Sequence, residues 1–160
     1  MLIKRLVKFC SLSWNKQWLV CAAFVLLGLV RLMVLAIPFR YLTRVLGVAA
    51  YNQAEQLPGT VQSVYPEIIR GVIQLVSPCT PWESKCLVQA ITAKILLRFK
   101  GLPSTLYLGV ARNDRHQLIA HAWLRCGQTI VTGGAVSHEF IVVSRFADAP
   151  GVPELSLIHI

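Results

Sequence analysis

Cys86 and His121 are the two side chains in this 160-residue sequence whose types and spacing could do chemistry. Cys86 stands where an irregular stretch gives way to a helical pattern, so we expect it in the first turn of a helix. The unpaired N–H groups and partial positive charge at a helix start both stabilise a thiolate. His121 follows 35 positions later in an expected strand, where its imidazole could take the thiol proton and later protonate a leaving amine.

Each of these residues has a plainer interpretation when it is taken alone. A free cysteine is most often a small buried hydrophobe, and a lone strand histidine is most often a hydrogen-bonded core residue. A cysteine at a helix start followed by a histidine on a sheet strand lets the sulfur point at the imidazole. The combination therefore favours a nucleophile and its base over two unrelated core residues.

The elements expected around this pair are helices followed by a small antiparallel sheet, an α+β layout. A turn at 57–59 precedes a helix over 60–77, and Cys86 opens a second helix that ends before Gly101. Three basic residues near the end of the second helix suit its dipole: Lys94, Arg98 and Lys100. Period-two alternation predicts four strands paired as a meander, at 106–111, 118–125, 129–132 and 140–146.

An apolar and basic segment precedes this layout. Residues 18–40 approach the roughly 20 apolar residues that cross a bilayer, but Arg31 would put a charge at mid-span. A membrane anchor, a helix buried against the rest of the chain and a helix lying in the membrane interface stay open as interpretations. We expect one or two helices that pack on the rest of the chain and also touch a membrane surface.

The chain accordingly divides into three parts. Residues 1–59 form a hydrophobic and basic helical segment, and residues 60–150 form the core that bears Cys86 and His121. Residues 151–160 form a short tail, whose ending LSLIHI we interpret as an artefact and exclude from the fold.

Charge and cysteine usage narrow the class of protein. The net charge is +9, the pI is about 9.8 and the mean hydropathy is +0.58, with no acidic residue before Glu55. A segment that is basic and apolar together favours a membrane surface or an acidic partner, and no motif of nucleic-acid recognition accompanies it. The five cysteines are an odd number without metal-ligand spacing, which favours free thiols in a reducing compartment and no bound metal. We therefore expect a cytoplasmic protein, associated with the membrane through its N-terminal segment.

Four motifs in residues 82–146 resemble a known family. They are P-W-x-x-x-C-L, R-x-K-G-L-P-x-x-L-Y-L-G-V, A-H-A-W-L and V-T-G-G. In combination they resemble the peptidase domain of lasso-peptide B proteins, which has a transglutaminase-like (papain-like) cysteine peptidase fold. The resemblance implies that Cys86 is the nucleophile and His121 the general base of an enzyme that cleaves a precursor peptide between leader and core. It also implies three partners: the lasso precursor, a separate leader-recognition (RRE-type) protein and an asparagine-synthetase-like, ATP-using cyclase.

The remaining site residues are less sharply defined by the sequence. The resemblance implies an orienting third residue on the strand after His121, with Glu139 or Thr132 as candidates. Three residues are candidates for the oxyanion site or the cleft wall: Gln89, Trp82 and Trp123. No cofactor is expected. A transglutaminase-type acyl transferase and a non-catalytic, membrane-associated scaffold of the maturation complex stay open as alternatives.

Overall fold

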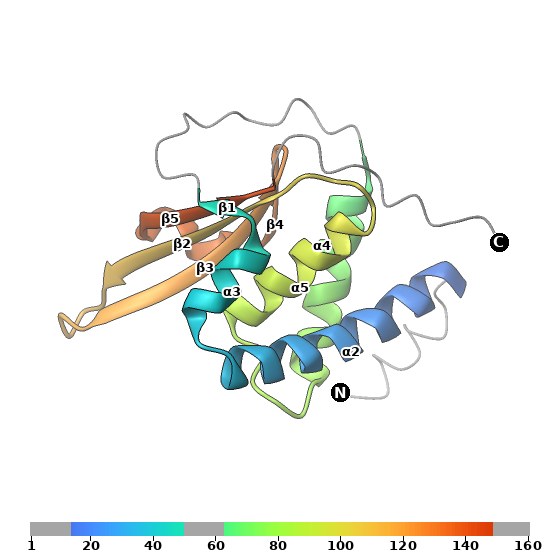
Figure 1. Ribbon diagram of the computed structural model, residues 1–160, viewed down its shortest axis with the longest axis horizontal. Coiled ribbons are helices and arrows are strands. Elements are labelled where there is room, and N and C mark those ends of the chain that lie inside the picture. The colour runs from blue at the N-terminus through green and yellow to red at the C-terminus, as the bar shows by residue number, and fades with distance from the viewer. Residues whose placement is uncertain (1–13, 50–62, 149–160) are drawn as a thin grey trace.

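The computed structural model describes residues 14–49 and 63–148, and these form one antiparallel sheet with helices packed against it. Figure 1 shows the sheet on the left and the helices α4, α5 and α2 to its right. The helices are α2 (Trp14–Ala36), α3 (Phe39–Leu46), α4 (Tyr65–Val76) and α5 (Cys86–Arg98), with short 3-10 turns η1 (Ser77–Cys79) and η2 (Gly134–Glu139). The strands are β1 (Val48–Ala49), β2 (Thr105–Arg112), β3 (Leu118–Cys126), β4 (Thr129–Thr132) and β5 (Ile141–Ala147).

The expected α+β class is confirmed, and the expected helix at Cys86 begins at that residue. Its end follows from a local signal: Gly101 adopts a left-handed φ of +66°, and Pro103 bars continuation. The helix expected over 60–77 is observed as α4, Tyr65–Val76, while residues 60–62, where it was expected to begin, lie outside the described residues. The domain boundary at residue 59 and the tail 151–160 lie outside them too.

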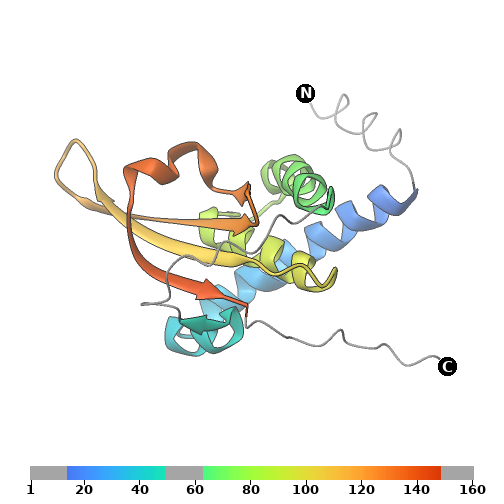
Figure 2. The same cartoon turned by 90° about the horizontal axis from the view of Figure 1, so that it is seen from above.

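The strand order corrects the predicted meander. The order is β1-β5-β2-β3-β4, so the last strand pairs with β2 and not with β4. Gly133 and η2 carry the chain back across the sheet between β4 and β5. The view from above in Figure 2 shows this return and shows the β2–β3 hairpin reaching beyond the helices. Alternation along a strand fixes which residues share a face, but it does not fix the neighbouring strand.

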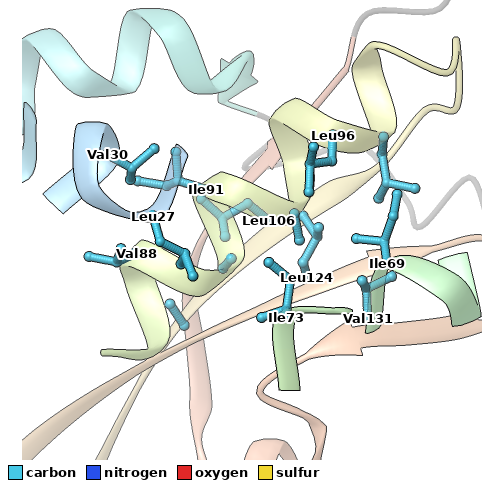
Figure 3. Close-up of a cluster of buried hydrophobic side chains, with 14 of the residues drawn as sticks. Leu27, Val30, Ile69, Ile73, Val88, Ile91, Leu96, Leu106, Leu124 and Val131 are labelled. Atoms are coloured by element: carbon cyan, nitrogen blue, oxygen red, sulfur yellow. The ribbon is translucent and has the colours of Figure 1, made fainter. Parts of the chain in front are cut away.

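The core lies between the sheet and the helices, and α2 belongs to it. Figure 3 shows Leu27 and Val30 of α2 beside α5, with Leu106 and Leu124 of the sheet beneath. Ala23, Leu27 and Val30 follow the four- and three-residue steps of one helix face and are fully or almost fully buried. The expectation that the N-terminal helices pack on the rest of the chain is met by this shared core.

A buried ion pair joins α5 to the end of β5. Lys94, which the sequence predicted as a positive charge near the end of this helix, is only 1% exposed, and its Nζ lies 3.0 Å from Asp148 Oδ1. The ammonium also donates to the carbonyl oxygens of Ser104 (2.7 Å) and Phe146 (3.3 Å). Arg98 Nε donates to the same carboxylate oxygen at 2.7 Å, and the Ser104 N–H donates to its other oxygen at 2.9 Å. The strand ends are therefore tied to the helix that begins at Cys86.

The two charges of this pair respond differently to burial. Burial lowers the pKa of Lys94 to about 8, against the opposing attraction of Asp148. Burial alone would raise the pKa of Asp148, but the charge of Lys94 and the hydrogen bonds from Ser104 and Arg98 outweigh it and hold that pKa below its usual value. The carboxylate is thus the better satisfied partner, because it accepts from several donors.

Candidate active site

The connector before Cys86 is held in shape by its own polar side chains. Thr80 Oγ1 lies 2.8 Å from Ser84 Oγ and 3.0 Å from the Trp82 carbonyl oxygen. Gln89 reaches back from the first turn of α5 and donates from Nε2 to the Ser84 carbonyl oxygen at 2.7 Å. These bonds fix the chain just before the helix and so fix where the Cys86 backbone enters it.

Cys86 stands at a helix start whose N–H groups are not capped by a side chain. The N-cap is Lys85, which makes no side-chain cap hydrogen bond, and the first turn holds no acidic residue. The N–H dipoles are therefore directed at whatever negative charge develops at the sulfur or at a bound carbonyl. The side chain is half-buried, so it packs on the core while remaining accessible.

The other described cysteines have different surroundings. Cys126 is 1% exposed, and burial raises the pKa of its thiol, which disfavours the nucleophilic thiolate. Cys79 is exposed, and its thiol donates to the Leu75 carbonyl oxygen at 3.4 Å. Cys21 is exposed on α2. Among the described cysteines, Cys86 alone combines partial exposure with the first position of an α-helix.

His121 lies on β3, and a backbone carbonyl holds its ring. Nε2 is 2.9 Å from the Gly133 carbonyl oxygen. A carbonyl oxygen only accepts, so Nε2 carries the hydrogen in this bond. The neutral ring then keeps an unprotonated Nδ1, which is the atom that can act as a base. The ring is half-buried between Phe140 at 5.0 Å and Trp123 at 6.1 Å between centroids, so its orientation is fixed by packing as well.

Gly133 is the residue at this site that sequence reasoning missed. Its φ of +71° is left-handed, and a Cβ built on it would lie 2.5 Å from the Ala122 oxygen and 3.0 Å from His121 Nε2. Only glycine lets the backbone approach β3 this closely. The sequence signal was the Gly133-Gly134 pair that follows the strand predicted at 129–132. A backbone acceptor has no residue type by which it could be recognised.

The two expected orienting residues lie elsewhere in the described site. The Thr132 hydroxyl is buried and has no hydrogen-bond partner among the described residues. Glu139 is exposed in η2, where Oε1 lies 3.7 Å from His138 Nε2. The hydrogen-bond partner that the structure gives to the imidazole is the residue between them, Gly133.

Cys86 and His121 do not share a hydrogen bond in the described part of the chain. The β2–β3 register is regular here, so alternation puts Ala122 and Leu124 on the face that α5 covers and His121 on the other face with Trp123. β4 pairs with β3 only from Leu124 to Cys126. At His121, the edge of β3 that faces away from β2 is therefore not paired with a strand and lies beside Gly133. The imidazole thus stands at an open margin of the sheet.

The expected cleft residues have structural contacts. Trp82 packs on α2, with its ring centroid 5.3 Å from that of Phe24, and its indole nitrogen is buried without a partner in the described residues. Trp123 stacks on Tyr107 at 5.5 Å and is 7% exposed. Gln89 donates to the connector, so its role in the structure is to shape the approach to Cys86.

Comparison with known proteins identifies the family. The family model described as the transglutaminase-like superfamily matches residues 29–145, which include the last third of α2 and all of the elements that bear Cys86 and His121. No curated protein and no solved structure matched the chain. Members of this superfamily are generally cysteine peptidases or acyl transferases. The family match covers most of the chain, and the protein belongs to the transglutaminase-like superfamily.

Proposed function

We propose that this protein is a cysteine peptidase that removes the leader from a lasso-peptide precursor, with Cys86 as nucleophile and His121 as general base. The observation that carries the base assignment is the bond from His121 Nε2 to the Gly133 oxygen, because it leaves Nδ1 as the basic atom. The uncapped start of α5 at Cys86 supports the nucleophile assignment. The four sequence motifs around these residues support the choice of substrate.

The reaction follows from these roles. His121 Nδ1 takes the thiol proton, and the Cys86 sulfur adds to the carbonyl carbon at the leader–core junction. The oxyanion is met by N–H groups at the start of α5. The C–N bond then breaks, and His121 returns the proton to the leaving core amine. Water, deprotonated by His121, hydrolyses the remaining thioester and frees the leader with a new carboxyl group.

The Gly133 carbonyl takes the part of the orienting third residue in this proposal. It fixes the tautomer of His121, as the carboxylate or amide of a triad does. A carbonyl carries no full charge, so it stabilises the imidazolium less than a carboxylate would. Because Cys86 begins the helix that covers one face of the sheet and His121 lies on the other face, the dyad also requires the imidazole and the sulfur to meet around the open margin of β3 beside Gly133.

The resemblance to lasso-peptide B proteins supports the choice of partners. Cleavage frees a core amino terminus, and an asparagine-synthetase-like, ATP-using cyclase would join that amine to a side-chain carboxyl group. A separate leader-recognition protein would present the precursor. We infer from these steps that the enzyme works in the cytoplasm.

Mass spectrometry of a lasso precursor incubated with this protein and a leader-recognition protein tests the proposal. We expect one cut between leader and core, abolished in Cys86→Ala and in His121→Ala. Cys79→Ala and His138→Ala are matched controls because both residues are exposed and outside the proposed dyad, and each should keep most of the activity. Equal loss in Cys79→Ala would overturn the assignment of the nucleophile.

Two other products would identify the alternatives. An amine adduct in place of the hydrolysed leader would assign an acyl transferase, because both enzymes pass through the same thioester. Precursor that is bound but never cut, with Cys86 unreactive toward iodoacetamide, would assign a scaffold.

A further inference from the structure

Helix α2 is apolar on all sides, but protein covers only one of them. The stripe of Ala23, Leu27 and Val30 is buried against the rest of the core. Large apolar side chains cover the rest of the helix and are 56–70% exposed: Trp18, Val25, Leu29, Leu32 and Leu35. A helix that is hydrophobic all round is normally surrounded by protein or lipid, so we expect another molecule to cover this exposed strip.

The charge within α2 is turned away from that strip. Arg31 is the one charged residue from position 17 to position 36 of the sequence. Its Nη2 lies 3.4 Å from Glu83 Oε2 in the connector before Cys86, and its side chain is only 22% exposed. The mid-helix charge, which counts against a helix that spans the membrane, is therefore paired on the protein side, and this leaves an apolar strip on the exposed side.

The composition of the strip distinguishes lipid from protein as its occupant. Protein interfaces carry about one hydrogen bond per 100–200 Å² together with a polar rim. Val25, Leu29, Leu32 and Leu35 offer no polar side-chain atom over almost three turns. The hydrocarbon part of a lipid surface forms no hydrogen bonds, so a lipid surface matches the strip better than a protein partner does.

Aromatic side chains stand near both ends of the strip. Trp18 lies at one end, and Phe39 and Tyr41 lie exposed just beyond the other. Trp and Tyr are the residues enriched at membrane interfaces. Arg40 stacks on Tyr41, with its guanidinium 4.7 Å from the ring centroid, and so adds a positive charge at the same end.

The charge of the sequence specifies the kind of lipid. Seven Lys or Arg residues and no Asp or Glu occur in residues 1–54. Basic residues close to a bilayer are attracted by anionic headgroups and only weakly by neutral ones.

The packing specifies how α2 lies. Ala23, Leu27 and Val30 share one core with α4 and α5 (Figure 3), so a helix that crossed the bilayer would have to leave that core or take the domain with it. We propose that α2 docks in the plane of an anionic membrane surface through the strip formed by Trp18, Val25, Leu29, Leu32 and Leu35. This inference is independent of the peptidase activity.

The docked helix would also hold the connector of the candidate site. Trp82 packs on Phe24, and a Cβ on Gly28 would lie 2.9 Å from the Trp82 ring. Arg31 is bound to Glu83 in the same connector. Three residues on successive turns of α2 therefore lie against Trp82 and Glu83, which precede Cys86 by four and three positions. Docking therefore keeps the start of α5 close to the membrane surface.

Flotation of the full chain with lipid vesicles tests the proposal. We expect binding to vesicles of phosphatidylcholine with phosphatidylglycerol, weaker binding to phosphatidylcholine alone, and loss of binding at high salt. A triple variant, Leu29→Ser with Leu32→Ser and Leu35→Ser, should bind at least about tenfold more weakly, since it removes apolar area from the strip. All three residues are exposed, so circular dichroism should show an unchanged fold.

The matched control removes equally exposed apolar residues elsewhere. Phe99→Ser, Leu118→Ser and Ile141→Ser lie outside α2 and are 71–75% exposed in the native chain, and this triple variant should bind vesicles as the native chain does. Equal loss in both triples, or no vesicle binding by the native chain, would overturn the proposal. A native dimer that the α2 triple converts to monomer would assign the strip to a second copy instead. Retention in membranes after alkaline carbonate washing would overturn the in-plane orientation.

Discussion

Replacing Gly133 by alanine tests whether a backbone carbonyl orients the imidazole. The new Cβ would lie 2.5 Å from the Ala122 oxygen, 2.9 Å from Trp123 Cβ and 3.0 Å from His121 Nε2. The first two neighbours belong to a paired strand, so Gly133 has to move away from β3, and its carbonyl moves with it. A displacement of about 1 Å at a catalytic group can cost about 100-fold in rate. We expect a loss of that size in the rate of leader cleavage.

Gly101→Ala is the control that separates this effect from backbone strain. Gly101 has a φ of +66°, close to the +71° of Gly133, but no atom lies within 4 Å of its added Cβ. Both variants bear the left-handed penalty of about 1–2 kcal/mol, measurable by urea denaturation. Overpacking should destabilise Gly133→Ala by about 1–3 kcal/mol more.

The assay needs a readout that a loss of stability alone would not change. Two-bond ¹H–¹⁵N correlation spectra report which ring nitrogen of His121 carries the hydrogen, and we expect Nε2–H in the native chain and a mixture of tautomers in Gly133→Ala. Gly101→Ala should keep both the native tautomer and the native cleavage rate. A folded Gly133→Ala variant that cleaves within about twofold of Gly101→Ala would refute the orienting role of the carbonyl.

The Lys94–Asp148 pair supports two further predictions. Asp148→Asn should lower the free energy of unfolding by about 3–5 kcal/mol in urea denaturation, because it leaves the buried Lys94 ammonium without its counter-charge. The control Glu67→Gln breaks an exposed pair with Arg70 and should leave the urea midpoint unchanged. If both variants shifted the midpoint equally, the Lys94 ammonium would have to be solvated and not buried. The free energy of unfolding should rise between about pH 8 and pH 10.5, because the pKa of Lys94 is about 8 when folded and 10.5 when unfolded, so the unfolded chain binds more protons there. Lys94→Met should flatten this rise, and an unchanged slope would refute the assignment to Lys94.

The sequence predicted the elements of this fold better than their arrangement. The helix at Cys86 and the four longer strands were predicted because periodicity and the signals at Gly101 and Pro103 are local. The pairing of β5 with β2 was not, because it depends on where η2 carries the chain. β1 has only two residues, Val48 and Ala49, which is too short a run for alternation to be recognised.

The site was predicted to a similar extent. Cys86 was placed at a helix start and His121 in a strand because residue type and local pattern both carry that information. The acceptor on Gly133 is a main-chain atom and has no residue type to mark it. Lys94 was predicted only as a positive charge that suits the helix dipole, because its counter-charge, Asp148, is 54 positions away in the sequence.

The contacts of Asp148 also set an order for folding during synthesis. The chain leaves the ribosome from its N-terminus, and domains fold as their residues become available. The helix that begins at Cys86 emerges early, but until residue 148 follows, Lys94 has no counter-charge with which to be buried. We therefore expect the helix that positions the nucleophile to lock onto the sheet only after Asp148 has been synthesised. The thiol would then gain its final surroundings only when β5 has already been made.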